Sequence, residues 1–176
     1  MIAPTTHAAD GTLETRAGRH VLRYERRLAH PVSRVWAALT ERSELRAWLA
    51  EAEVLELQPG GRVRLAWLNT DDQGNRAVAS GTITALEPPR LLEMDVEPHG
   101  VLRFELREDG PGTALVFTVS VAAPMDQVGL ALAGWHIHLE HLADALDGRP
   151  VDWPAWDAVH RPRWDALYAA YGARDA

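Results

Sequence analysis

From about residue 62 to residue 121 the chain consists of short segments in which apolar and polar residues alternate, and this pattern limits the fold more than any other feature. In the segment RVRLAW, residues 62–67, Val63, Leu65 and Trp67 point to one face and the two arginines to the other, which is typical of a strand with one buried face. Turn residues, such as those of DDQGN and the PPR beginning at Pro88, join successive segments. Because strands joined by short turns usually pair with their neighbours in sequence, we expect an antiparallel meander rather than a parallel sheet.

Helical patterns flank this run of strands. The stretch PVSRVWAALT, residues 31–40, has apolar residues at helical spacing behind a proline that suits a first helical turn, and a second short helix is expected over residues 41–50. A strand with the pattern VLRYERRL, residues 21–28, precedes them, so that about seven strands are expected in all. A long helix should then run over residues 126–147 and stop at Gly148. The sequence therefore predicts an α+β fold.

The long helix carries three histidines within six residues, His136, His138 and His141. Its apolar stripe falls within about 40° of one line on a helical wheel, and consists of Val128, Leu132, Trp135, Leu139, Leu142 and Leu146. His136 and His138 then flank the stripe on opposite sides, whereas His141 lies near the back and is expected in solvent. HIHLEH is not the HExxH pattern, and the three side chains diverge too far to share one ion, so we expect no metal site and no cofactor.

Charge and cysteine content exclude several classes of function. The chain has 25 acidic and 18 basic residues, a formal net charge of -7, and no run of lysine or arginine, so nucleic acid and anionic membrane surfaces are poor partners. Cysteine is absent, which removes disulfides, thiolate metal ligands and cysteine nucleophiles. No apolar run approaches the roughly 18 residues that cross a bilayer, and the start of the chain lacks the regions of a signal peptide. We therefore expect a cytoplasmic protein.

One domain is expected to account for most of the chain. Residues 1–18 are polar and aperiodic and are expected to form a flexible leader, residues 19–148 a single folded domain, and residues 149–176 an extension rich in aromatic residues. Four residues of the extension recur at the spacing of a short amphipathic helix: Trp164, Leu167, Tyr168 and Tyr171. We expect this helix to pack back on its own domain, and a homodimer contact or a lid over a cavity are the alternatives.

The order of these elements, and five stretches within them, resemble a known superfamily. The stretches are RRLAHPVSRVWAALTERSELRAWL (26–49), PGGRVRL (59–65), SGTITALEPPRLLEM (80–94), GTALVFTV (112–119) and GWHIHLEHLADALDG (134–148). Together they resemble the START-like, or SRPBCC, superfamily with its helix-grip fold, and within it the bacterial proteins named after the Hsp90 ATPase activator homologue. The resemblance implies a sheet that curls around the long helix and leaves a cavity for an apolar or amphipathic small molecule.

The residues expected to line this cavity share the parity of an inner strand face or lie on the short and long helices. They are Arg26, Trp48, Leu65, Trp67, Met94, Phe104, Phe117, Leu132, Trp135, His136, His138 and Leu139. Alternation cannot separate a cavity from a filled core, because both use the same residues. Arg26 shares the parity of the apolar face of its strand, so it should turn inward and meet a carboxylate or an acidic ligand, unless a bulge turns it outward.

Three functions are compatible with these patterns. The first is a catalytically silent protein that binds a small hydrophobic ligand. The second is an enzyme of the cyclase, dehydratase or hydrolase kind, with Arg26, His136 or His138 as the polar groups of an apolar pocket and a histidine as general acid or base. The third is a protein-interaction module in the manner of a chaperone activator. Ionisable groups in the cavity would favour the second function, and an exposed apolar patch the third.

Overall fold

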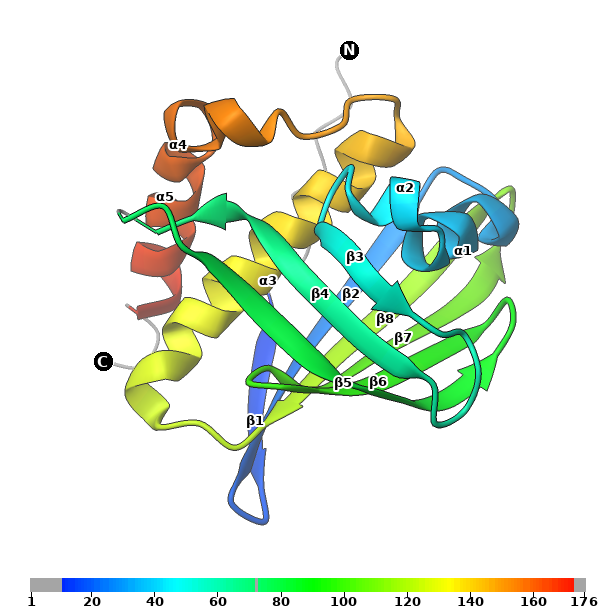
Figure 1. The fold of residues 1–176 in the computed structure, drawn as a ribbon, viewed down its shortest axis with the longest axis horizontal. Helices are drawn as coiled ribbons and strands as arrows, with labels where there is room; N and C mark the ends of the chain where they lie inside the picture. The colour runs from blue at the N-terminus through cyan, green and yellow to red at the C-terminus, as the bar shows by residue number, and fades with distance from the viewer. Residues whose placement is uncertain (1–10, 72, 173–176) are drawn as a thin grey trace.

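The computed structural model describes residues 11–71 and 73–172. An eight-stranded antiparallel sheet, with the strand order β1-β2-β8-β7-β6-β5-β4-β3, curves around one long helix, α3 (Figure 1). The elements are β1 (Thr12–Arg16), β2 (Arg19–Leu28), α1 (Val32–Thr40), α2 (Arg42–Leu45), β3 (Ala50–Leu55), β4 (Arg62–Thr70), β5 (Arg76–Glu87), β6 (Leu91–Glu97), β7 (Gly100–Asp109), β8 (Gly112–Val121), α3 (Met125–Leu146), the short 3-10 helix η1 (Trp153–Ala155), α4 (Trp156–Val159) and α5 (Arg161–Gly172).

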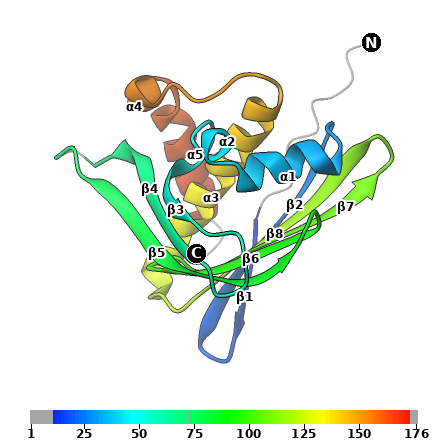
Figure 2. The ribbon, with the colours of Figure 1, turned by 45° about the vertical axis from the view of Figure 1, so that its right-hand side comes forward.

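The sheet and the helices pack in layers around α3. Figure 2 shows α3 in the concavity of the sheet, with α1 and α2 over one end of the sheet and α4 and α5 against the side of α3. The strands from β4 to β8 form the expected meander, and β2 closes it by pairing with β8. The α+β helix-grip fold expected from the sequence is confirmed. Among the described residues, no helix is long and apolar enough to cross a membrane.

Two expectations about the first half of the chain were wrong. Residues 12–16, which were expected in the leader, form β1 and pair antiparallel with β2. With β3, which was not expected either, the sheet has eight strands where about seven were expected. The pattern TLETR has no apolar face, because β1 is an edge strand with mostly exposed side chains. Residues 1–10 of the expected leader lie outside the described residues. The second short helix is only four residues long, and β3 already begins at Ala50.

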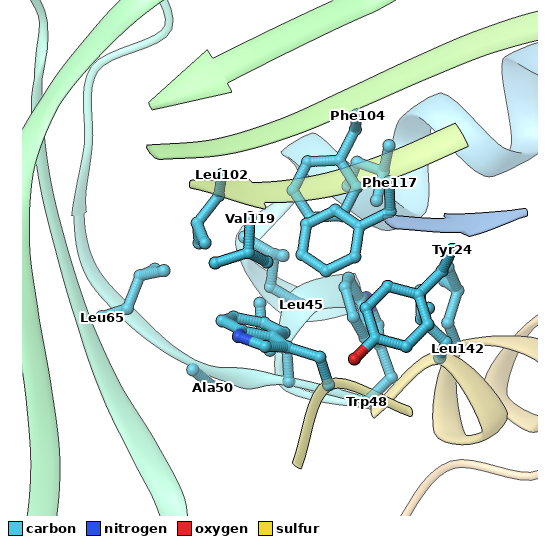
Figure 3. Close-up of a cluster of buried hydrophobic side chains, with 14 of the residues drawn as sticks. Tyr24, Leu45, Trp48, Ala50, Leu65, Leu102, Phe104, Phe117, Val119 and Leu142 are labelled. Carbon is cyan, nitrogen blue, oxygen red and sulfur yellow. The ribbon is translucent and has the colours of Figure 1, made fainter. Parts of the chain in front are cut away.

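The hydrophobic core fills the end of the sheet beneath α1 and α2. Figure 3 shows the rings of Phe104 and Phe117 there, with centroids 4.4 Å apart, next to Tyr24 and Trp48. The polar atoms of the latter two rings are satisfied by backbone: the Tyr24 hydroxyl donates to the Leu132 carbonyl at 2.8 Å, and the Trp48 indole donates to the carbonyl of residue 38 at 2.9 Å. Buried aromatic rings with paired polar atoms stabilise a core, because no polar group is left unsatisfied.

The helix α3 is buried on more than one side. Trp135 of the expected stripe contacts Trp67 and Phe117 of the sheet, and α5 packs against α3. Burial on more than one side explains why all three histidines of the helix, His136, His138 and His141, are buried as well as the stripe. The extension therefore packs on its own domain, with Leu167 and Tyr171 buried, while Tyr168 is 40% exposed.

Candidate functional site

A cleft of about 510 Å³ opens between the sheet and the first half of α3. Its walls are β4, the turn between β6 and β7, the end of β8 and one side of the helix. The residues that line it are Trp67, Asn69, Pro98, His99, Val119, Val121, Ala123, Gln127, Val128, Leu130, Ala131, Gly134, Trp135 and His138. Most of these residues are apolar or aromatic, and among the described lining residues none is lysine, arginine, aspartate or glutamate.

Four rings gather at the inner end of this cleft. The ring centroids of Trp67 and His99 are 4.6 Å apart, and Trp135 meets both rings edge-on at 6.2 and 5.7 Å. His138 stands 6.4 Å from Trp67 and 6.1 Å from Trp135. Edge-to-face and offset rings at these separations attract one another through their quadrupoles. The cluster therefore forms a preformed aromatic wall made from a strand, a turn and a helix.

Local sequence explains why these side chains meet. Trp67 and Asn69 lie in the last part of β4, where its pairing with β5 is irregular between Ala66 and Thr70, and both line the cleft. His99 lies in the turn of PHG, where Gly100 adopts a φ of +81°. A Cβ at Gly100 would stand 2.3 Å from the Ser120 carbonyl oxygen of β8, and only glycine combines that backbone with that closeness. The glycine thus fixes the turn that carries His99 over the cleft.

Two polar atoms of the cleft residues are buried and have no hydrogen-bond partner among the described residues. They are Oδ1 of Asn69 and Nε2 of His99. Burial lowers the pKa of His99, so this imidazole is neutral at neutral pH. A buried polar atom without a partner costs free energy, and such atoms in native structures often mark a place where a ligand or water binds.

His138 is held between two tryptophans. Its Nδ1 lies 3.0 Å from the Trp48 carbonyl oxygen, and the Trp67 indole donates to its Nε2 at 3.2 Å. Since a carbonyl only accepts and an indole only donates, Nδ1 carries the proton and the ring is neutral. Burial lowers the pKa of His138 to about 4; the hydrogen bond to Trp48 opposes this shift and nearby His99 adds to it. His138 therefore lines the cleft as a neutral, fully paired side chain.

His141, which the helical wheel places in solvent, is buried, and this expectation was wrong. The Trp156 indole donates to its Nε2 at 3.1 Å, and the His160 ring lies 4.5 Å from its ring. Both partners belong to the extension, which covers the back of α3. Burial, followed by the neighbouring rings of His138 and His160, lowers the pKa of His141 to about 3.

His136 belongs to a third, separate network. Its Nδ1 lies 2.8 Å from the Tyr171 hydroxyl, and its Nε2 lies 3.4 Å from Glu140. The Tyr171 hydroxyl in turn accepts from the Gly11 backbone at 2.7 Å, so this network joins both ends of the described chain to α3. Burial raises the pKa of Glu140, but hydrogen bonds from His136 and Arg163 outweigh burial and hold this pKa at about 2.

The three histidines thus point to three different sets of partners. Within residues 11–71 and 73–172 no group of three or more histidine, cysteine or carboxylate side chains is placed to hold a metal ion. Each ring instead joins α3 to another part of the molecule: His136 to α5, His138 to β4, and His141 to α4. Their clustering in sequence reflects three packing contacts on three sides of one helix.

The structure divides the expected cavity residues among three places. Trp67, Trp135 and His138 line the cleft. Four others surround a void of only about 10 Å³, so they belong to a filled core: Trp48, Leu65, Met94 and Phe104. The remaining five are buried but are not among the described residues that line the cleft: Arg26, Phe117, Leu132, His136 and Leu139. The space at this site is therefore an open cleft at one end of α3, away from the centre of the sheet.

Asn69 and His99 were missed in the sequence. Asn69 has the same strand parity as Trp67, but β4 pairs irregularly with β5 between Ala66 and Thr70, so parity alone does not place its side chain. His99 lies in a turn, and a turn residue follows no periodicity that would predict the direction of its side chain.

Arg26 points inward, as its parity predicts, and β2 pairs with β8 without a bulge. Its guanidinium stands 5.6 Å from the centre of the Tyr24 ring, and its Nη1 donates to the Glu25 carbonyl oxygen at 2.8 Å. A cation above an aromatic face is attracted by the ring quadrupole. Arg26 is only 8% exposed and is not among the described residues that line the cleft. It is therefore part of the buried interior that β2 covers.

A curved antiparallel sheet around one long C-terminal helix, with two short helices inserted and a cleft between sheet and helix, defines a START-like domain of the helix-grip class. The sequence model of the family described as "Activator of Hsp90 ATPase homolog 1-like protein" matches residues 29–147. This chain belongs to that family. The match ends one residue before Gly148, where the domain was expected to end, and leaves the extension outside.

Solved structures of the same fold cover the chain to different extents. The protein encoded by gene BPP1335 of Bordetella parapertussis is 29% identical, with a TM-score of 0.68 over 99% of this chain and 95% of that one. CalU16 of Micromonospora echinospora is 24% identical, with a TM-score of 0.69 over 98% of this chain and 95% of that one. A Rhodobacter sphaeroides protein, also 24% identical, has a TM-score of 0.64 over 79% of this chain but 99% of its own. No curated protein matches the chain.

Proposed function

We propose that this protein binds a small, largely apolar molecule in the cleft between the sheet and α3, without catalysing a reaction on it. The observation that carries the proposal is the cleft itself: about 510 Å³, lined by apolar and aromatic residues, with two buried polar atoms that have no partner among the described residues. Small-molecule sites usually measure about 300–1,000 Å³ and combine apolar walls with a few polar groups. The cleft fits that description.

The three groups considered for catalysis, Arg26, His136 and His138, do not act as acid or base in this cleft. His99, whose Nε2 has no partner among the described residues, is the one histidine of the described lining that could exchange a proton. A general acid or base needs a nitrogen that can exchange a proton with the substrate. His138 already uses both ring nitrogens in hydrogen bonds to Trp48 and Trp67. His136 and Arg26, the other polar groups considered for catalysis, are not among the described cleft residues.

A chaperone-activator role would require an apolar surface for a protein partner. Among the described residues the exposed large apolar side chains are Leu57 after β3, Met125 and Leu130 on α3, Val159 on α4 and Tyr168 on α5, of which Tyr168 lies against Gly129 of α3. Leu130 is part of the cleft wall, which makes its exposure a property of the ligand site. A homodimer through the extension and a cytoplasmic location stay predictions from the sequence.

Titration with Nile red, a neutral fluorescent probe of apolar sites, tests the proposal. Gly134 lines the cleft, and a Cβ built there meets no atom within 4 Å. Gly134→Trp should therefore project its ring into the cleft and reduce probe affinity at least tenfold. The matched variant Gly134→Ala adds one methyl group and should retain affinity.

The result that would overturn the proposal is equally definite. Wild-type protein that gives no saturable fluorescence change, or a Gly134→Trp protein that folds and binds Nile red as well as the wild type, would show that the cleft is not a ligand site. Circular dichroism of all three proteins establishes that each is folded before affinities are compared.

A further inference from the structure

We propose that the molecule held in this cleft is uncharged and carries a hydroxyl group, and that Asn69 and His99 recognise this hydroxyl while Trp67 and Trp135 contact an apolar body. This inference rests on the proposed function, because it names the class of ligand for the same cleft. It follows from the charges, the polar atoms and the rings of the cleft, taken in turn.

Charge is the first constraint. Among the described residues of the lining, none carries a formal charge, and His138 is kept neutral by its two hydrogen bonds. A carboxylate, phosphate or ammonium group that entered the cleft would lose its water without gaining an opposite charge. Burial of an unpaired charge is strongly unfavourable, so the lining selects against ions of either sign.

The polar atoms give the second constraint. Asn69 Oδ1 can only accept a hydrogen bond, whereas His99 Nε2 accepts or donates according to its tautomer. Both atoms are buried and lack partners among the described residues. A hydroxyl group donates one hydrogen bond and accepts others, so it suits the amide oxygen and, in either tautomer, the imidazole. Because both atoms are buried while their residues are partly exposed, the two side chains turn towards the cleft to meet the hydroxyl. A ketone or ether could not pair with Asn69 Oδ1, since such groups have no proton to donate.

The rings give the third constraint. Trp67 and Trp135 stand edge-to-face, 6.2 Å apart, and His99 lies 4.6 Å from Trp67. An apolar or aromatic body placed against these rings gains contact with their faces and displaces water from apolar surface. Because His99 belongs to both the ring cluster and the polar pair, an apolar body attached to a hydroxyl beside His99 lies next to Trp67 and Trp135.

Affinities for three probes of one shape test this inference: 2-naphthol, naphthalene and 2-naphthoate, each measured by displacement of Nile red. Wild-type protein should bind 2-naphthol about tenfold more tightly than naphthalene, as expected for one net hydrogen bond. It should bind 2-naphthoate more weakly than either. In Asn69→Leu and His99→Phe, which keep side-chain size but remove the polar atoms, the preference for 2-naphthol should fall towards equality while naphthalene affinity is retained.

The outcomes separate this inference from the proposed function. If none of the three probes binds and Nile red does not bind either, the proposed function fails. If naphthalene binds as tightly as 2-naphthol, or if both variants keep the wild-type preference, the assignment of a hydroxyl to Asn69 and His99 is overturned while the cleft remains a ligand site. If 2-naphthoate binds most tightly, the requirement for an uncharged ligand is overturned. The comparison of probes on wild-type protein decides the last point without any variant.

Discussion

The indole nitrogen of Trp67 on β4 donates a hydrogen bond to Nε2 of His138 on α3, over a distance of 3.2 Å. The other ring nitrogen of His138, Nδ1, donates a hydrogen bond to the Trp48 carbonyl oxygen. A wall residue of the cleft is therefore joined to the filled core by one neutral imidazole. Rigid walls favour binding because less conformational freedom is lost when a ligand enters.

Removal of this indole donor should destabilise the protein. Trp67→Phe keeps an aromatic ring but leaves Nε2 of the buried His138 without its donor, and we expect the free energy of unfolding to fall by about 1–3 kcal/mol beyond the loss from a smaller ring. Urea unfolding at pH 7 measures the change. Trp135→Phe, which also trims an indole in the cleft wall, is the control. Equal losses in the two variants would contradict the structural role given to the hydrogen bond.

Stability should decrease on mild acidification. The pKa values of His138 and His141 are about 4 and about 3 in the folded protein, against about 6.5 in an unfolded chain. Between pH 6.5 and 4 the unfolded chain binds more protons than the folded one, so the free energy of unfolding falls as pH falls. Each histidine contributes a slope of up to about 1.4 kcal/mol per pH unit.

Urea unfolding at pH 7 and at pH 5 measures this slope. Both pH values lie above the pKa values of carboxylates such as Glu140, so the histidines dominate the difference. The double variant His138→Gln, His141→Gln should lose most of the dependence, even though it starts from a lower stability. A wild-type protein equally stable at pH 7 and pH 5 would show that these rings are not buried in their neutral form.

The extension should control the pKa of His141. Trp156 is buried and donates to this ring, so Trp156→Ala should cost about 3–5 kcal/mol as a deleted buried aromatic side chain. It should also raise the pKa of His141 from about 3 towards the ordinary value, which NMR of the imidazole signals measures. Trp164→Ala, at a partly buried position of the same extension, should leave that pKa unchanged. An unchanged pKa in Trp156→Ala would mean that the extension does not cover His141.

Two glycines of the site should respond to alanine with opposite signs. Gly134 lies inside α3 with open space around an added Cβ, and Gly134→Ala should stabilise the helix by about 0.5–1 kcal/mol. Gly100 has a φ of +81° and only 2.3 Å to a backbone oxygen, so Gly100→Ala should destabilise the protein and disturb the turn of His99. Thermal unfolding of both variants measures the difference, and shifts of the same sign would contradict this description of the cleft.

Much of the fold could be predicted because periodicity reports which face of an element is buried. The alternation of residues 62–67 and the apolar stripe of residues 126–147 predicted β4 and α3 from local pattern alone. The strand β1 could not be predicted in this way, since TLETR is an exposed edge whose pairing depends on β2. Local pattern reports burial against the main core, and it does not predict an edge strand such as β1, which is held mainly by backbone pairing and contributes only Leu13 to the margin of the core.

The site was less predictable, for a related reason. Burial of His141 depends on Trp156, fifteen residues further along the chain, and a helical wheel contains no information on a later segment that folds back. The centre of the expected cavity, around Leu65 and Phe104, has the same parity whether it is open or filled, and packing decides between the two. Only the fold shows that the open space lies instead beside Trp67 and Trp135.

The location of bound probe in solution is the most direct test of the cleft as a ligand site. A ¹H–¹⁵N NMR titration with 2-naphthol can follow the indole signals of Trp67, Trp135 and Trp153 in one spectrum. We predict saturable shifts of the Trp67 and Trp135 indoles and of the His99 backbone amide at one equivalent of probe, with the Trp153 indole unmoved and all shifts lost in Gly134→Trp. Saturable shifts centred on Trp153, or the absence of saturable shifts anywhere in the spectrum, would contradict the account.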